Sequence, residues 1–301
     1  MSKPVRFLST TLIFLTLLIP RAFSEAHAST SLSSKQAREV IRHVGGSDLS
    51  KGSVKVRGVQ PASDGGADVL AQLKLAFRMI RDDHDGWHVE EVRTGDRRWE
   101  EVAMIVNAVY GGRLLLSDAG QESGFSGFNA TSELSPERAR RLIADLLEVQ
   151  LPSDAVRVNA VSALGNSALV ETEIELEFHL VREGNTWRVQ KSRTAGNNWQ
   201  DVDAILGSIN QQKIARARDE MQQIVRALEV FRSERGFYVD AMNEGALVDH
   251  LSPQYLNRVI RFDPWNRLYQ YEGTRGHFTL RSLGADGKPQ TADDIVMSGG
   301  S

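Results

Sequence analysis

The chain has 301 residues and contains no cysteine. This absence excludes disulfide bonds, thiolate metal sites and cysteine nucleophiles. The chain also has no excess of basic residues, because its 36 lysines and arginines are outnumbered by 39 aspartates and glutamates. A protein without a basic excess lacks the electrostatic footprint of a nucleic-acid binder, so we expect no nucleic-acid partner.

The apolar run near the N-terminus is short. Residues 7–19 fall below the roughly 20 residues that a membrane-spanning helix needs. The run follows Lys3 and Arg6 and precedes a small-residue cleavage site at residues 26–28, which is the order found in a secretory signal peptide. We therefore predict a signal peptide at residues 1–28 and a periplasmic or secreted protein. An uncleaved segment would instead tether the chain to the inner membrane, and only then do we expect membrane contact.

Catalytic motifs are also missing. The seven histidines lack the HExxH spacing and any other close spacing of metal ligands. The stretch SGFSGF lacks the spacing of a nucleophile elbow, and GADGK lacks that of a phosphate-binding loop. His84 and His88 flank a predicted turn, and a solvated turn explains them better than a shared site. We therefore expect a non-enzymatic protein with no catalytic residues.

The chain does contain an internal repeat. The stretch DGWHVEEVRTGDRRWEEVAMIVNAV aligns with GNTWRVQKSRTAGNNWQDVDAILGSI, so that Trp87 matches Trp187 and Trp99 matches Trp199 at an offset of 100. Upstream, ADVLAQLKLAF aligns with ALVETEIELEF at an offset of 101, and SVKVRGV aligns with AVRVNAV at an offset of 102. Because the offset changes only at turns, we interpret the two segments as a duplicated domain.

Each copy follows one plan of secondary structure. A short amphipathic helix precedes a strand with alternating valines, a longer alternating strand, a third strand that begins at the first tryptophan, and a closing helix near the second tryptophan. The predicted fold class is α+β, with two tandem helix–three-strand–helix repeats at residues 29–113 and 133–210. A linker rich in Gly and Ser separates them at residues 114–132. The layout resembles cystatin-like and nuclear-transport-factor-like domains, which host many functions.

Two repeated features admit two interpretations each. The four repeated tryptophans either line a binding site or cap the core and anchor the closing helices, and the strand and helix boundaries favour the second. The acidic ladder at alternate positions from Glu171 to Glu177 is either a cation or partner surface or the solvated face of a strand. Its alternation with apolar residues favours a solvated face.

A different kind of domain follows at residues 211–301. Apolar residues step by three and four from Ile214 to Phe231, which predicts a long amphipathic helix. The predicted elements are a helix through residues 201–235 with a break near Gly207, a short helix at 245–251, and strands at 268–271 and 277–282. They form a long helix packed on a small antiparallel sheet.

Short motifs in this segment stand in a distinctive order. Gly236-x-Tyr238 is followed by DPW at residues 263–265, YxY at 269–271, SLGADG at 282–287, and Asp294 near the end. The order resembles the C-terminal head domain of the major pseudopilin of bacterial type II secretion (pseudopilin G), a type IV pilin-like family, over about residues 211–297. The resemblance implies a pilin-like head, with other secretion or pilus components as partners.

In the pseudopilin family, the SLGAD loop binds a structural calcium ion that holds the C-terminal loop in place. Carried onto this sequence, the resemblance implies Asp286 and Asp294 as side-chain ligands, Asp293 as a further carboxylate, and Leu283 through its carbonyl oxygen. Calcium prefers about six to eight oxygen ligands, which suits these residue types. Glycines at 284 and 287 allow the positive φ angles that turn carbonyls inward. From the residues alone, a plain exposed Asp/Gly turn is the alternative.

The chain departs from the family pattern in three ways. It has DPWNRLY where the family has DPWGNPY, the loop before Asp293 is short, and the residues before the head are polar instead of a long hydrophobic helix. We therefore do not expect it to assemble a pilus in the usual way. We predict an exported structural or interaction protein with a calcium-stabilised head, associated with type II secretion or a related pilus-like machine. The alternative is a periplasmic binding protein whose repeat domains hold a small ligand or peptide.

Overall fold

The computed structural model describes residues 31–82, 86–96, 98–110, 134–148, 154–194, 197–242 and 244–300. The predicted signal peptide at residues 1–28, the predicted linker at 114–132 and His84 lie outside the described residues. None of the helices within these ranges is both long enough and apolar enough to span a membrane.

Two similar series of elements occupy the first two-thirds of the chain. The first series consists of α1 (Ser34–Arg42), the 3-10 turn η1 (Val44–Gly46), β1 (Val54–Pro61), β2 (Ala67–Arg81), β3 (Trp87–Arg93), β4 (Trp99–Glu101) and α2 (Val102–Tyr110). The second series consists of α3 (Pro136–Leu146), β5 (Val156–Leu164), β6 (Ser167–Glu183), β7 (Thr186–Thr194), β8 (Gln200–Asp201) and α4 (Val202–Arg235). The short strands β4 and β8 precede the closing helices, so these helices begin later than the tryptophans at which we expected them.

Serine side chains begin the first helix of each series. Ser33 accepts the backbone N–H of Gln36 at 3.3 Å, and the Gln36 side chain accepts the backbone N–H of Ser33 at 3.1 Å. Ser135 accepts the backbone N–H of Arg138 at 3.2 Å, with Pro136 at the first helical position. These caps satisfy N–H groups that have no partner inside the helix, which is why both helices start where the sequence predicts.

The strands of both series form one eight-stranded antiparallel sheet in the order β4-β3-β2-β6-β7-β8, with β1 paired to β2 and β5 paired to β6. The central pair is β2 with β6, which runs from Ala67 opposite Leu180 to Ile80 opposite Ser167. Near its middle, Leu73 lies opposite Ile174. The sequence comparison aligns these two residues with each other, so the pairing relates matching positions of the two series.

Each end of the sheet has its own core, and both cores combine the two series. One core joins Ile41 of α1 and Val54 of β1 to Leu180 of β6. The other joins Ile143 of α3 to Met79 of β2. In agreement with this, α1 also contacts β7, and α3 also contacts β3. The first helix of each series therefore packs on strands of the other, an exchange that no local pattern along the sequence predicts.

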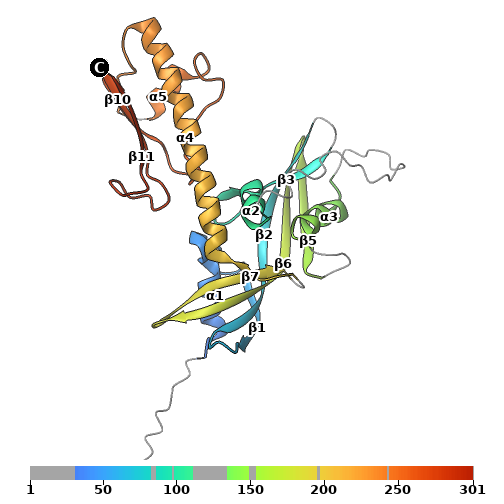
Figure 1. Ribbon diagram of the computed structural model, residues 1–301. Helices are drawn as coiled ribbons and strands as arrows, with labels where there is room; N and C mark the ends of the chain where they lie inside the picture. The colour runs from blue at the N-terminus through green and yellow to red at the C-terminus, as the bar shows by residue number, and fades with distance from the viewer. Residues whose placement is uncertain are drawn as a thin grey trace, which may run out of the picture. The chain divides into compact units, whose positions relative to one another are not determined.

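The helix α4 is continuous over 34 residues from Val202 to Arg235, and the expected break near Gly207 is wrong. A glycine inside a helix costs about 1 kcal/mol relative to alanine. Packing on both sides of Gly207 offsets this cost, because Val202 is buried in the core of the large sheet and Phe231 is buried in the C-terminal core. One helix thus leads from the eight-stranded sheet into the C-terminal region (Figure 1).

The C-terminal region consists of the second half of α4, α5 (Glu244–Leu251) and a three-stranded antiparallel sheet in the order β11-β10-β9. Its strands are β9 (Gln270–Gly273), β10 (His277–Ser282) and β11 (Ile295–Gly300). The apolar stripe of α4 packs on this sheet through Met221, Leu228 and Phe231, as the sequence predicts. The strand β11 was not predicted. Its pairing with β10 makes residues 283–294 the connection between two neighbouring strands.

Candidate functional site in the loop between the last two strands

Asp263 joins the DPW turn to the beginning of the loop at residues 283–294. The side chain is buried, and the residue is 3% exposed. Its Oδ1 accepts the backbone N–H groups of Trp265 at 3.0 Å and Arg267 at 2.9 Å, and its Oδ2 accepts the hydroxyl of Ser282 at 2.6 Å. Because both oxygens are engaged, the turn and the end of β10 are held in one arrangement. The sequence indicates Asp263 only as part of the DPW motif, and this role is visible only in the structure.

Two of the four predicted calcium ligands meet at Thr291. The Thr291 hydroxyl lies 2.7 Å from Oδ1 of Asp293 and 3.3 Å from Oδ1 of Asp286. Asp293 also accepts the backbone N–H of Asp286 at 2.9 Å. This backbone hydrogen bond, with help from Thr291, lowers the pKa of Asp293 below its ordinary value. Asp293 therefore braces the loop in its ionised form.

The other two predicted ligands make hydrogen bonds of their own. The Asp294 Oδ2 atom accepts the backbone N–H of Gln290 at 2.9 Å, whereas its Oδ1 atom is buried and has no hydrogen-bond partner. The carbonyl oxygen of Leu283 accepts the backbone N–H of Gly287 at 3.2 Å. A buried carboxylate oxygen without a donor is costly, and a bound cation is one way to satisfy it.

The donor chemistry of the loop fits a hard cation, since every predicted ligand atom is an oxygen. However, the carboxylates of the loop already accept hydrogen bonds from the backbone N–H groups of the same loop. Within the residues that the structure describes, no three His, Asp or Glu side chains are grouped so that they could hold a metal ion. The structure thus brings Asp286 and Asp293 together and does not gather all four predicted ligands around one point.

Two glycines give the loop its shape, as the sequence predicts. Gly284 has φ of 60°, and a Cβ atom there would lie 2.3 Å from the carbonyl oxygen of Asp293. Gly287 has φ of 67°, and a Cβ atom there would lie 2.5 Å from Cζ of Arg267. At Gly284 the close atom belongs to the backbone, so this position requires glycine for space as well as for backbone conformation. At Gly287 the close atom is the flexible end of Arg267, and the positive φ is what favours glycine.

Arg267 follows the DPW motif and contacts the loop, a role that was not predicted from the sequence. Its Nη1 atom donates to the carbonyl of Gly284, and its Nη2 atom donates to the carbonyl of Ala285 at 3.1 Å. The sequence marked this position only as a departure from the family's DPWGNPY. A basic residue beside a loop with three aspartates was the available signal.

A network of ion pairs joins α4 to β4 and the residues just before it. Lys213 of α4 is 3% exposed, and its Nζ atom lies 2.5 Å from Oε2 of Glu100. Arg98 donates to the other oxygen of Glu100 at 2.8 Å. Burial lowers the pKa of Lys213, and the pairing with Glu100 acts in the opposite direction. Nearby, Arg216 bridges Glu101 and Glu220. These contacts fix the continuous helix to the large sheet.

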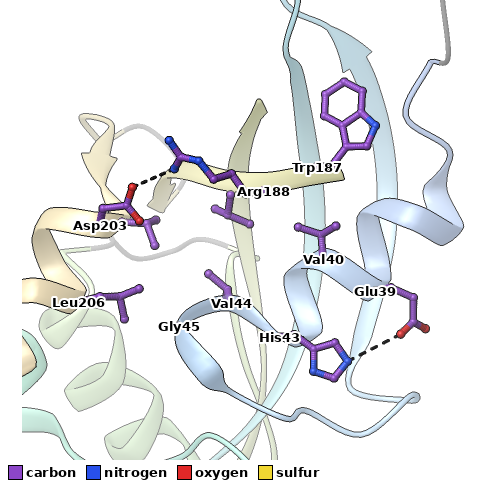
Figure 2. Close-up of a pocket in the computed structure, with 11 residues that line it drawn as sticks. Glu39, Val40, His43, Val44, Gly45, Trp187, Arg188, Asp203 and Leu206 are labelled. Atoms are coloured by element: carbon purple, nitrogen blue, oxygen red, sulfur yellow. Dashed lines mark hydrogen bonds and ion pairs between the residues drawn. The ribbon is translucent and has the colours of Figure 1, made fainter. Parts of the chain in front are cut away.

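Two cavities of similar size lie at matching positions of the two series. One, of about 460 Å³, lies between α1, β7 and the start of α4, where Val40, Val44 and Leu206 are flanked by the ion pair of Arg188 with Asp203 at 2.9 Å (Figure 2). The other, of about 470 Å³, is lined by Trp87, Val106 and Leu142 among others. Both are apolar grooves with charged rims, and no described residue in them forms a nucleophile–base pair.

Trp87 and the acidic ladder agree with the interpretations that the sequence favours. Trp87 is buried in a core, and the Arg193 guanidinium lies 4.3 Å from the ring centre of Trp199. In the ladder, Glu173 accepts the Gln72 side chain at 3.0 Å, and Glu177 pairs with Arg193 at 2.5 Å. Polar and basic neighbours on the same sheet thus compensate the acidic face.

A long helix whose second half packs on a three-stranded antiparallel sheet, with an aspartate-rich loop before the last strand, is the arrangement that the resemblance to a pilin-like head leads us to expect. Residues 204–298 match the family described as "Type II secretion system (T2SS), protein G". The type II secretion system core protein G of Pseudomonas aeruginosa is 32% identical over 106 residues, which cover 31% of this chain and 74% of that protein. The chain belongs to the type II secretion system protein G family through this region. No solved structure matches the chain.

Proposed function

We propose that the protein is an exported, non-enzymatic structural or interaction component of a type II secretion system or a related pilus-like machine. The observation that carries this proposal is the family match over residues 204–298, which includes nearly all of the head and most of α4. The pilin-like proteins of such machines act by contacting one another, so the head is the part that contacts other secretion components.

The eight-stranded sheet provides the second interaction module. In support of this role, α4 is one continuous helix that packs on the large sheet at its start and forms part of the head at its end. The ion pair of Lys213 with Glu100 joins this helix to β4. We attribute the sheet to a duplicated α+β unit, because matching residues such as Leu73 and Ile174 face each other at its centre. In this proposal, the protein presents a secretion-family head together with the eight-stranded sheet, on the periplasmic side of the membrane after cleavage of residues 1–28.

A calcium ion is part of the proposal. Asp286, Asp293 and Asp294 would hold it together with the carbonyl oxygen of Leu283. When bound, calcium supplies a hard positive charge that neutralises the loop carboxylates. The buried and unpartnered Oδ1 atom of Asp294 supports such a cation. Isothermal titration of the full chain with calcium chloride tests this. We expect binding that Asp294→Asn abolishes and that Asp249→Asn, at an exposed position of α5, leaves intact.

Deletion of the gene in its own host tests the role in secretion. We expect the deletion to reduce the set of proteins found outside the cell, and we expect a tagged full chain to co-purify a secretion component after mild cross-linking. Restoring the gene should restore both. An unchanged extracellular proteome together with no secretion component in the purified material would overturn the role.

A further inference from the structure

We propose that Arg267 is an internal cation that closes the loop at residues 283–294, so that the loop keeps its form when no calcium is bound. The inference concerns the same loop as the proposed calcium site. It rests on that site only where the effect of Arg267 is compared with the effect of calcium. The observations that carry it are the contacts of one guanidinium with two neighbouring carbonyls and with the backbone of Gly287.

The base of the Arg267 side chain is fixed before the side chain reaches the loop. Its backbone N–H donates to Oδ1 of Asp263 at 2.9 Å, and its carbonyl accepts the backbone N–H of Asp263 at 2.7 Å. Asp263 is itself buried and bound to Ser282 at the end of β10. The guanidinium therefore approaches the loop from a position that the DPW turn determines, which reduces the entropy lost when it binds.

The guanidinium then binds the carbonyl oxygens of Gly284 and Ala285 with two different nitrogen atoms. A planar guanidinium has several donors in a fixed fork, so it can serve two adjacent acceptors at once, whereas an ammonium group cannot match that geometry. Backbone carbonyls of a tight loop are also the oxygens that calcium uses. Arg267 thus supplies a cation to the carbonyls of Gly284 and Ala285, next to the Leu283 carbonyl that is predicted to bind calcium.

The loop also provides space for the guanidinium. A Cβ atom at Gly287 would lie 2.5 Å from Cζ of Arg267, so the group rests directly on the loop backbone. On the other side of the loop, the carboxylates of Asp286 and Asp293 accept backbone N–H groups.

Hydrogen–deuterium exchange of the full chain, with excess EDTA or with millimolar calcium chloride, tests the inference. The reporting amides are those of Gly287, Lys288 and Gln290, which donate to Leu283, Asp286 and Asp294. In EDTA, we expect these amides to stay protected in the wild type. In Arg267→Gln, we expect exchange about tenfold faster or more, because two charge-assisted hydrogen bonds are lost. Arg267→Lys should lie between the two.

The control variant is Arg275→Gln, whose guanidinium lies over the ring of Phe237 and away from the loop. It should leave exchange of the three amides unchanged. Protection of the β9 and β10 amides in every variant verifies that the head is folded.

The outcomes separate the two proposals. If Arg267→Gln loosens the loop and calcium has no effect on any variant, the inference stands and the calcium site falls. If the wild-type loop opens in EDTA as far as the variant does, or if Arg267→Gln changes nothing in EDTA, the inference is overturned, whereas calcium binding by the wild type would still support the calcium site.

Discussion

At the scale of single residues, Asp263 illustrates how one buried carboxylate organises a polar loop. Three donors from two segments converge on it, two of them backbone N–H groups. A carboxylate in this position accepts more hydrogen bonds than a neutral side chain can, and it orients the residue, Arg267, that reaches the loop carbonyls. The aspartate of the DPW motif thus has a structural role that does not involve a metal.

We expect Asp263→Ala to destabilise the protein by about 2–4 kcal/mol, because it leaves buried donors without an acceptor. Asp263→Asn should cost about half as much, since its amide oxygen still accepts one of the two sets of donors. Urea unfolding of the full chain, monitored by circular dichroism, measures both. Asp249→Ala, at an exposed position of α5, is the control. Equal stabilities of Asp263→Ala and the control would contradict the assignment.

A second prediction at this scale concerns pH. Hydrogen bonds lower the pKa of Asp293 from its ordinary value of 3.8. The ionised form therefore stabilises the fold at pH values above about 4, and this contribution is lost as the pH falls through the lower folded pKa. In calcium-free buffer, stability should decline less steeply below pH 4 in Asp293→Asn than in the wild type. Parallel curves from thermal unfolding at several pH values would refute this role.

At the scale of elements, the buried pair of Lys213 and Glu100 determines how α4 is attached to the large sheet. Both side chains are largely withdrawn from water, so their mutual attraction compensates the cost of burial. A break in the pair leaves one charge buried without a partner, which is the expensive case.

We expect Glu100→Gln to destabilise the protein by about 3 kcal/mol or more, because the buried ammonium loses its counter-charge. The double variant Lys213→Met with Glu100→Leu should recover most of that loss, because it removes the buried ammonium together with its counter-charge. Chemical unfolding of the three proteins provides the measurement, with Lys35→Met at an exposed position of α1 as the matched control. A double variant no more stable than Glu100→Gln would show that the pair is not the cause.

Elements in which apolar residues recur at a regular spacing could be predicted from the sequence. The alternation in Leu73, Leu75 and Phe77 predicts β2, and the stripe from Ile214 to Phe231 predicts the head half of α4. The strand β11 could not, because its sequence IVMSGG is short and ends in glycine, and its partner β10 alone defines it. The continuity of α4 through Gly207 also depends on packing at both ends. In the loop, the aspartates could be singled out from the sequence, whereas the contacts of Thr291 with Asp286 and Asp293 and of Arg267 with the loop carbonyls could not.

At the scale of the whole molecule, the pairing of β2 with β6 means that neither series of elements forms a complete core. The chain from Leu32 to Ser301 forms one compact unit. Ile41 of the first series needs Leu180 of the second, and Ile143 of the second needs Met79 of the first. Long-range pairing of this kind is invisible to a search for local patterns, because the register between distant strands depends on tertiary contacts.

The exchange of helices predicts how a divided chain should behave. Produced alone, residues 31–110 should lack cooperative thermal unfolding, because α1 and β1 lose the strands on which they pack. Produced together with residues 134–301 as two separate chains, they should assemble into one complex that elutes as a single species in gel filtration and unfolds in one transition. The variant Leu180→Asp in the longer fragment should prevent assembly, since it places a charge in the core that contains Ile41. As the matched control, Leu164→Asp, at an 88% exposed residue of β5, should leave assembly intact. If residues 31–110 fold cooperatively alone and do not bind the longer fragment, the two series are independent domains, and the shared sheet does not hold them together.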